Sequence, residues 1–153
     1  MSKKLYSPVA RQMTTRRPSD SSQQGPEGNL DFEINFFEGL LADSPDFVEA
    51  LVALAEAYTR KGWHRKGLET DEKITRLCPG DPVAHYNLAC SHALLGQLDA
   101  AMESLKKSLA LGYRDLRHLE QDKDLENLRK DSRLRELLSR FFPPKADRTS
   151  NQL

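Results

Sequence analysis

Residues 87–111 read NLACSHALLGQLDAAMESLKKSLAL, and this stretch decides the fold class. Apolar side chains recur every three or four residues on both sides of Gly96, which is the spacing of one face of an α-helix. Gly96 interrupts the pattern, because glycine readily adopts the left-handed backbone conformation that ends a helix. The stretch predicts two helices joined by a tight turn. Because we find no convincing alternation typical of strands elsewhere, we expect an all-α fold.

The chain repeats itself with a period of 34 residues. When residues 48–81 are aligned with residues 82–115, these pairs are identical: Ala50 and Ala84, Leu54 and Leu88, Ala55 and Ala89, Gly62 and Gly96, Glu69 and Glu103, Lys73 and Lys107, Leu77 and Leu111. Pro45 and Pro79, which punctuate the starts of the units, are separated by the same distance. Each unit is predicted to be a helical hairpin, and a fixed period of this length is typical of stacked repeat proteins.

These features together resemble the tetratricopeptide repeat. The resemblance rests on the period, the Leu54–Ala55 pair, Tyr58, the glycine stops, Ala101 and the terminal Pro79. The second unit matches more closely than the first, in which Asp71 occupies a normally aromatic position. The resemblance implies a short right-handed α-solenoid of antiparallel helix pairs that works by binding other proteins.

Two repeats are fewer than the roughly three that such arrays need to bury a continuous core, so we expect both ends to be capped. Upstream, residues 30–45 resemble the second helix of a truncated repeat. Downstream, pairs of leucines recur every nine residues, which predicts three short capping helices: Leu116 and Leu119, Leu125 and Leu128, Leu134 and Leu137. This segment resembles the end-of-group extension of bacterial tetratricopeptide proteins, which implies a bacterial source.

The predicted organisation has six parts. They are a disordered basic arm (1–29), an N-terminal capping helix (30–45), the first repeat (46–79), the second repeat (80–113), C-terminal capping helices (114–142) and a disordered tail (143–153). The arm carries five Lys or Arg against two acids, in a stretch rich in Ser, Gln, Pro and Gly.

The bulk composition excludes several function classes. Across 153 residues, 23 Lys and Arg balance 23 Asp and Glu, so we expect neither nucleic-acid nor membrane binding. Two cysteines are too few for a disulfide framework. No apolar run approaches the roughly 20 residues of a membrane span. We expect a cytoplasmic protein without a cofactor.

The family geometry implies a concave groove lined by the first helix of each repeat. It would present Glu49, Val52, Glu56, Thr59 and Arg60 from the first repeat, and Val83, Tyr86, Asn87, Cys90 and Leu94 from the second. Tyr86 and Asn87 are the predicted anchors for a peptide or helix of a partner, because they pair a large amphipathic ring with a two-way amide. Self-association and a secretion or assembly chaperone role remain alternatives within the same fold.

An alternative in another class is a metal- or thiol-using enzyme built on Cys78, His85, Cys90 and His92, which lie within fifteen residues. The spacing argues against it. His85 and His92 are two helical turns apart, about 10 Å along the axis, which is too far to bind one ion. We therefore expect packed histidines, ordinary thiols, no metal and no catalysis. His64 and His118 are likewise predicted to be surface or packing residues.

Asp71 is the remaining polar anomaly, since the family usually buries an aromatic ring at its position. A buried carboxylate is costly unless it is paired and hydrogen-bonded. One hypothesis is that Asp71 bonds to His85, His92 or Tyr58; the other is that it reaches solvent. Trp63, in the turn between helices, is predicted to pack on its own repeat or to form an exposed contact point.

Overall fold

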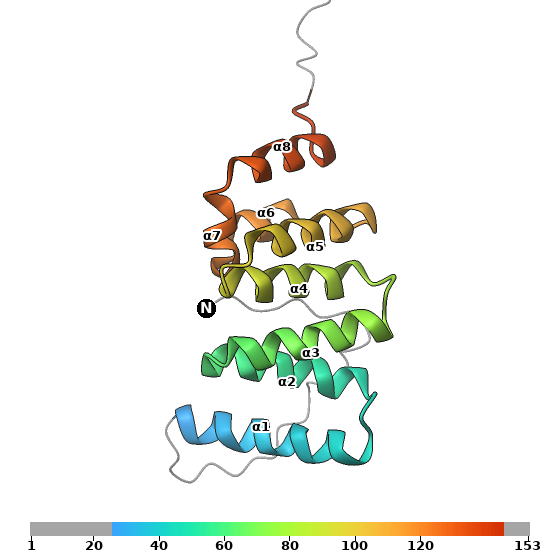
Figure 1. The fold of residues 1–153 in the computed structure, drawn as a ribbon, viewed down its shortest axis with the longest axis vertical. Helices are drawn as coiled ribbons and strands as arrows, with labels where there is room; N and C mark the ends of the chain where they lie inside the picture. The colour runs from blue at the N-terminus through green and yellow to red at the C-terminus, as the bar shows by residue number, and fades with distance from the viewer. Residues whose placement is uncertain (1–25, 146–153) are drawn as a thin grey trace, which may run out of the picture.

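The computed structural model describes residues 26–145. These residues form helices and no strand, which confirms the all-α fold class. The helices follow one another along a single stack, from α1 at one end to α8 at the other (Figure 1). Their bounds are α1 (Pro26–Asp43), α2 (Val48–Lys61), α3 (His64–Leu77), α4 (Pro82–Leu94), α5 (Leu98–Ala110), α6 (Leu116–Gln121), the 3₁₀ helix η2 (Lys123–Leu125), α7 (Glu126–Arg129) and α8 (Ser132–Phe141).

Two helical hairpins, α2–α3 and α4–α5, form the centre of the stack. Gly62 and Gly96 end the first helix of each hairpin with positive φ angles of 81° and 72°. The backbone amide of each glycine donates a hydrogen bond to the end of the preceding helix: Gly62 donates to the carbonyl of Thr59, and Gly96 donates to the carbonyl of Ala93. A side chain with a Cβ atom is disfavoured at these angles, which explains why glycine occupies both turns.

Helix α1 covers the front of the first hairpin. Leu30 and Ile34 are buried against Leu54, Ala57 and Tyr58 of α2. The helix begins at Pro26, four residues earlier than the predicted start at residue 30, so the end of the predicted disordered arm is helical. Proline suits a first helical turn because its missing N–H has no partner there. The rest of the arm, and the tail from residue 146, lie outside the described residues.

The segment after α5 forms a second cover, here called the C-terminal cap (α6, η2, α7 and α8). Three aspartates start its helices: the Asp115, Asp122 and Asp131 side chains accept from the amides of His118, Asp124 and Arg133. Leu119, Leu125 and Leu128 are fully buried in the same core as α4 and α5. The cap therefore extends the core of the second hairpin, and η2 and α7 pack directly against α4.

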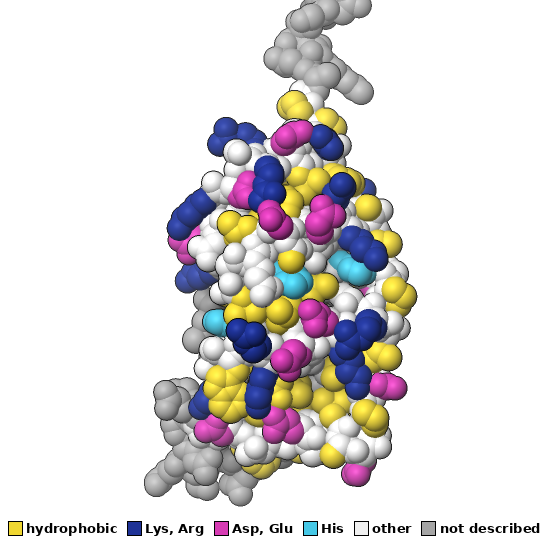
Figure 2. Space-filling view, in the orientation of Figure 1, with side chains coloured by type: hydrophobic (Ala, Val, Ile, Leu, Met, Phe, Trp, Pro, Cys, Tyr) yellow, Lys and Arg dark blue, Asp and Glu magenta, His cyan; other side chains and the backbone are white. Residues whose placement is uncertain are grey.

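Within the described residues, no helix combines the length and the apolar character needed to cross a lipid bilayer. On the face shown in Figure 2, acidic and basic side chains are interspersed along the stack, and hydrophobic side chains gather toward the α1 end.

Candidate partner-binding site

The outward side of α2 carries the first half of the predicted groove, and we call it the α2 face (Glu49, Val52, Ala53, Glu56, Thr59 and Arg60). Its opposite side is buried through Leu51, Leu54 and Tyr58. Four of the five predicted groove residues of α2 are half-buried and Arg60 is exposed. Arg60 forms an ion pair with Glu33 of α1 at 3.0 Å. Partial exposure leaves these side chains available to a partner while their stems stay packed.

The second half of the predicted groove is largely closed. Val83 and Leu94 are half-buried, but Tyr86 and Cys90 are 0% exposed and Asn87 is 5% exposed. The prediction that Tyr86 and Asn87 anchor a partner is therefore wrong for this structure, because neither side chain has a surface to offer. The physical reason is the C-terminal cap, which packs on the side of α4 that the family geometry assigns to the groove.

Tyr86 is the centre of the contact between α4 and the cap. Its hydroxyl donates a hydrogen bond to Oδ2 of Asp122 at 2.8 Å. Its ring stacks on Tyr113 with centroids 4.5 Å apart, and the His118 ring lies 5.6 Å away. Nothing local in the sequence pairs Asp122 with a tyrosine 36 residues upstream.

The buried phenols of this contact are held in their neutral form. Burial, followed by the electrostatic effects of Cys90 and Asp122, raises the pKa of Tyr86 far above its usual value. Burial also raises the pKa of Tyr113, with Asp115 as the next cause. A desolvated phenol keeps its proton because the phenolate would lose its hydration. Tyr86 therefore acts as a permanent hydrogen-bond donor that locks the cap to α4.

The Cys78, His85, Cys90 and His92 cluster does not converge on a common point. His85 Nε2 lies 2.8 Å from the carbonyl oxygen of Pro79, and His92 Nδ1 lies 2.7 Å from Gln97 Oε1. His85 is buried, as predicted, whereas His92 is only half-buried. Of these four residues, only Cys90 belongs to a metal-capable group among the described residues, together with Asp122 and Asp124. These four residues therefore do not form one metal-binding group in the part of the chain that the structure describes.

Asp71 is buried at 1% exposure, so it does not reach solvent. Its Oδ2 accepts a hydrogen bond from the Ser91 hydroxyl of α4 at 2.5 Å. The Tyr58 hydroxyl donates to Glu38, so it is not the donor to Asp71, and a bond from Asp71 to a histidine stays a prediction. The carboxylate links the two hairpins, from α3 to α4, where other repeats use an aromatic ring.

Several exposed aromatic side chains lie near the α1 end. Phe32 and Phe36 of α1 are 65% and 56% exposed, and sequence reasoning did not single them out. Their i, i+4 spacing, which puts them on one side of the helix, was the available signal. Trp63 is also exposed, although its ring lies 6.0 Å from that of Tyr58 and Lys66 Nζ lies 4.7 Å from its centroid. Trp63 therefore packs partly on its own repeat, and its role as a contact point for a partner stays a prediction.

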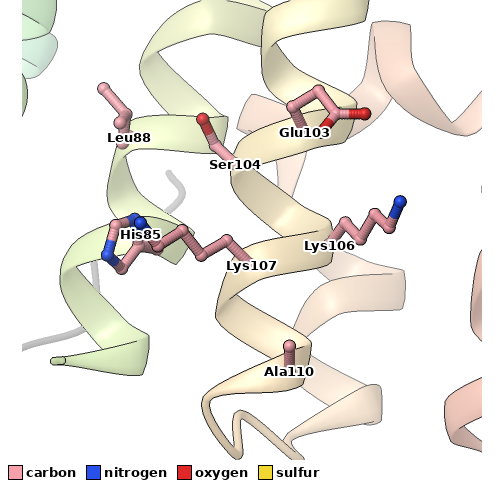
Figure 3. A pocket seen from close by; sticks show the side chains of 7 residues that line it. All are labelled: His85, Leu88, Glu103, Ser104, Lys106, Lys107 and Ala110. Carbon is pink, nitrogen blue, oxygen red and sulfur yellow. The ribbon is translucent and has the colours of Figure 1, made fainter. Parts of the chain in front are cut away.

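A shallow depression of about 470 Å³ lies between α4 and α5. His85 and Leu88 line it from α4, and Lys106 and Lys107 are among the residues that line it from α5 (Figure 3). The Nε2 atom of His85 is engaged with the carbonyl oxygen of Pro79. We assign no chemistry to this depression.

The second hairpin matches a known family of repeat proteins. Residues 82–111, which contain α4 and α5, match the family model described as tetratricopeptide repeat. The chain is also similar to a chloroplastic protein of Arabidopsis thaliana, with 33% identity over 87 residues. The match covers 55% of this chain and 26% of that protein, so it extends over about a quarter of the relative. That relative comes from a plant, and the bacterial source and cytoplasmic location predicted above stay predictions. The chain therefore contains one matched tetratricopeptide repeat, in residues 82–111.

Proposed function

We propose that this chain binds a peptide or a helix of another protein along the α2 face, without catalysis of its own. The observation that carries the proposal is the contrast between the two hairpins. The α2 face is partly open, whereas the equivalent positions of α4 are covered by the C-terminal cap. A partner that uses the first helices of the repeats is thereby directed to α2 and to the adjoining Val83.

The composition of the α2 face defines the kind of partner. Val52, Ala53 and Val83 offer apolar contact, while Glu49 and Glu56 supply two carboxylates. A segment that combines an apolar anchor with a nearby Lys or Arg would match both features, since charge complementarity contributes mainly to specificity and association rate. A chaperone role would use the same surface and differ in taking an unfolded client.

Selection of a displayed peptide library on the purified full-length chain tests this proposal. Titration of a selected peptide then gives its dissociation constant for wild type, for Val52→Arg and for a matched control, Leu77→Arg. Leu77 is an exposed leucine on the second helix of the same repeat. We expect Val52→Arg to weaken binding at least about tenfold, which corresponds to about 1.4 kcal/mol, and Leu77→Arg to leave it unchanged. Equal binding by wild type and Val52→Arg contradicts the proposal.

Self-association is a second candidate function, and the exposed Phe32 and Phe36 favour it. Terminal repeats of solenoids need a polar outer face to stay soluble, and α1 instead exposes two phenyl rings. We propose that α1 pairs with α1 of a second copy across these rings. Sedimentation of wild type is expected to give a dimer that the double variant Phe32→Glu, Phe36→Glu converts to a monomer, while Leu111→Glu stays dimeric. A monomeric wild type at high concentration contradicts this candidate.

A further inference from the structure

Four side chains with metal-ligating atoms meet where the C-terminal cap contacts α4. They are Cys90 of α4, His118 of α6, Asp122, which caps η2, and Asp124 within η2. From this geometry we propose that the chain binds one Zn²⁺ ion between Cys90, His118, Asp122 and Asp124. The site shares only Cys90 with the cluster considered from the sequence.

Two distances within the group agree with those between ligands of one zinc ion. Cys90 Sγ lies 3.7 Å from Asp122 Oδ2, and His118 Nε2 lies 3.2 Å from the same oxygen. Bonds of about 2.3 Å to sulfur and 2.0–2.2 Å to nitrogen or oxygen, at tetrahedral angles, separate such atoms by about 3.6 Å and about 3.4 Å. Ligand atoms of Cys90, Asp122 and Asp124 all lie within 4.8 Å of one another. His118 does not belong to that 4.8 Å group, so its ring would have to move for all four side chains to enclose one ion.

Two polar atoms beside the group support a ligand rather than a closed hydrogen-bond network. His118 Nε2 is inaccessible to solvent and, despite its 3.2 Å approach to Asp122, is not aligned for a hydrogen bond with any described residue. The Tyr113 hydroxyl is likewise buried, beside the hydroxyl of Tyr86. Buried polar atoms of this kind call for an ion or water.

The chemistry of the four side chains suits zinc. Thiolate, imidazole and carboxylate are its usual protein ligands, whereas magnesium and calcium favour oxygen ligands alone. A divalent cation would also offset the charge of two neighbouring carboxylates of low exposure. His118 retains partial exposure, so an ion would enter past its ring.

A bound ion would bridge the second repeat and the cap. Cys90 is contributed by α4, and the other three ligands follow α5 in the chain, so the metal would tie residue 90 to residues 118–124 across the α4–α5 hairpin. Zinc binding requires the Cys90 thiol to release its proton and the His118 ring to be neutral, so affinity is expected to rise with pH. The role is structural, since all ligand positions belong to the protein.

Titration of the metal-free, reduced full-length chain with Zn²⁺ tests the proposal. Calorimetry is expected to show one equivalent bound, accompanied by a higher melting temperature. Co²⁺ used as a spectroscopic probe should produce thiolate-to-metal charge-transfer absorption. Cys90→Ser is expected to abolish that absorption, and the matched control Cys78→Ser, which alters the other thiol, to preserve it.

His118→Gln gives a second variant that keeps Cys90 and changes a partly exposed side chain. We expect it to retain the wild-type circular dichroism and to weaken Zn²⁺ binding at least tenfold. If Cys90→Ser fails to fold, the Zn²⁺ affinity of His118→Gln alone tests the proposal. A folded wild type that takes up no Zn²⁺, or binding that survives both Cys90→Ser and His118→Gln unchanged, overturns the proposal.

Discussion

Tyr86 shows how one residue can change role through its surroundings. Its position in the repeat is one that faces the groove in the family geometry, yet its hydroxyl is bonded to Asp122 and its ring is stacked on Tyr113. The hydrogen bond joins a neutral donor to a buried carboxylate, a combination that contributes more than a neutral pair. A residue placed for recognition is thus used to hold the protein together.

Removing the hydrogen-bond acceptor should show how much this contact stabilises the fold. Asp122→Ala leaves the buried Tyr86 hydroxyl without its acceptor and removes the cap of η2, so we expect the free energy of unfolding to fall by about 2–4 kcal/mol. Urea unfolding in the presence of a chelator measures it. In a double-mutant cycle with Tyr86→Phe, the two changes should couple by at least about 0.5 kcal/mol. Strict additivity would show that the bond contributes nothing.

The raised pKa values of Tyr86 and Tyr113 predict a loss of stability in alkali. The unfolded chain ionises its phenols near pH 10, whereas the folded chain keeps these two protonated at higher pH. Their contribution is complete below about pH 10 and declines as the pH rises further. The free energy of unfolding should therefore fall above pH 10, and less steeply in Tyr86→Phe. Ionisation of both phenols near pH 10 with the fold intact would be inconsistent with this.

The partner of Asp71 illustrates what a sequence leaves open at this scale. The repeat pattern correctly indicated that the position faces its neighbour, and the carboxylate is buried there. The sequence did not point to Ser91, because α4 carries several polar residues. The repeat period alone does not indicate which of them meets Asp71. Which of several nearby donors reaches a carboxylate depends on rotamers and helix crossing, which have no local signature.

At the scale of elements, the short helices of the cap carry more of the core than their length suggests. Leu125 ends a three-residue 3₁₀ helix and Leu128 lies in a four-residue helix, and both are fully buried. Helices this short have little stability alone, so their packing against α4 and α5 holds them in place. The aspartate caps then fix where each one begins.

Truncating a single cap leucine should accordingly be as costly as a change in the repeats. We expect Leu128→Ala to lower the free energy of unfolding by about 2–5 kcal/mol, because it removes buried methyl groups and leaves a cavity. Leu111→Ala, at an exposed leucine between α5 and the cap, should change it by less than about 0.5 kcal/mol. Chemical denaturation of both variants provides the comparison. Equal and small effects would show that the cap is only loosely attached.

The elements themselves were predictable because their signals are local. Helical periodicity, the stops at Gly62 and Gly96 and the aspartates at helix starts each act within a few residues, and the structure contains helices with those ends. The surface covered by the cap was not predictable from such signals. That outcome depends on contacts such as Tyr86 with Asp122, separated by 36 residues in the chain. The predicted groove wrongly included Tyr86 and Asn87 of α4 for the same reason, because the prediction assumed that the C-terminal cap leaves α4 uncovered.

For the whole molecule, the central claim is that the cap closes the second repeat and leaves the α2 face as the accessible part of the predicted groove. The two cysteines report on this directly, because Cys90 lies under the cap and Cys78 lies half-buried in the turn between the repeats. Cys90 would face solvent if the groove of α4 were open. No partner is needed for the measurement.

Thiol labelling of the native, metal-free chain is the most direct test, with Cys78→Ser and Cys90→Ser used to assign each rate. Burial raises the pKa of Cys78 somewhat, so the reaction is best run at mildly alkaline pH. We predict that Cys78 reacts promptly and that Cys90 reacts only as fast as the cap opens, with both becoming equally reactive in denaturant. Prompt labelling of Cys90 in the folded chain, at a rate comparable to that of Cys78, would contradict the account.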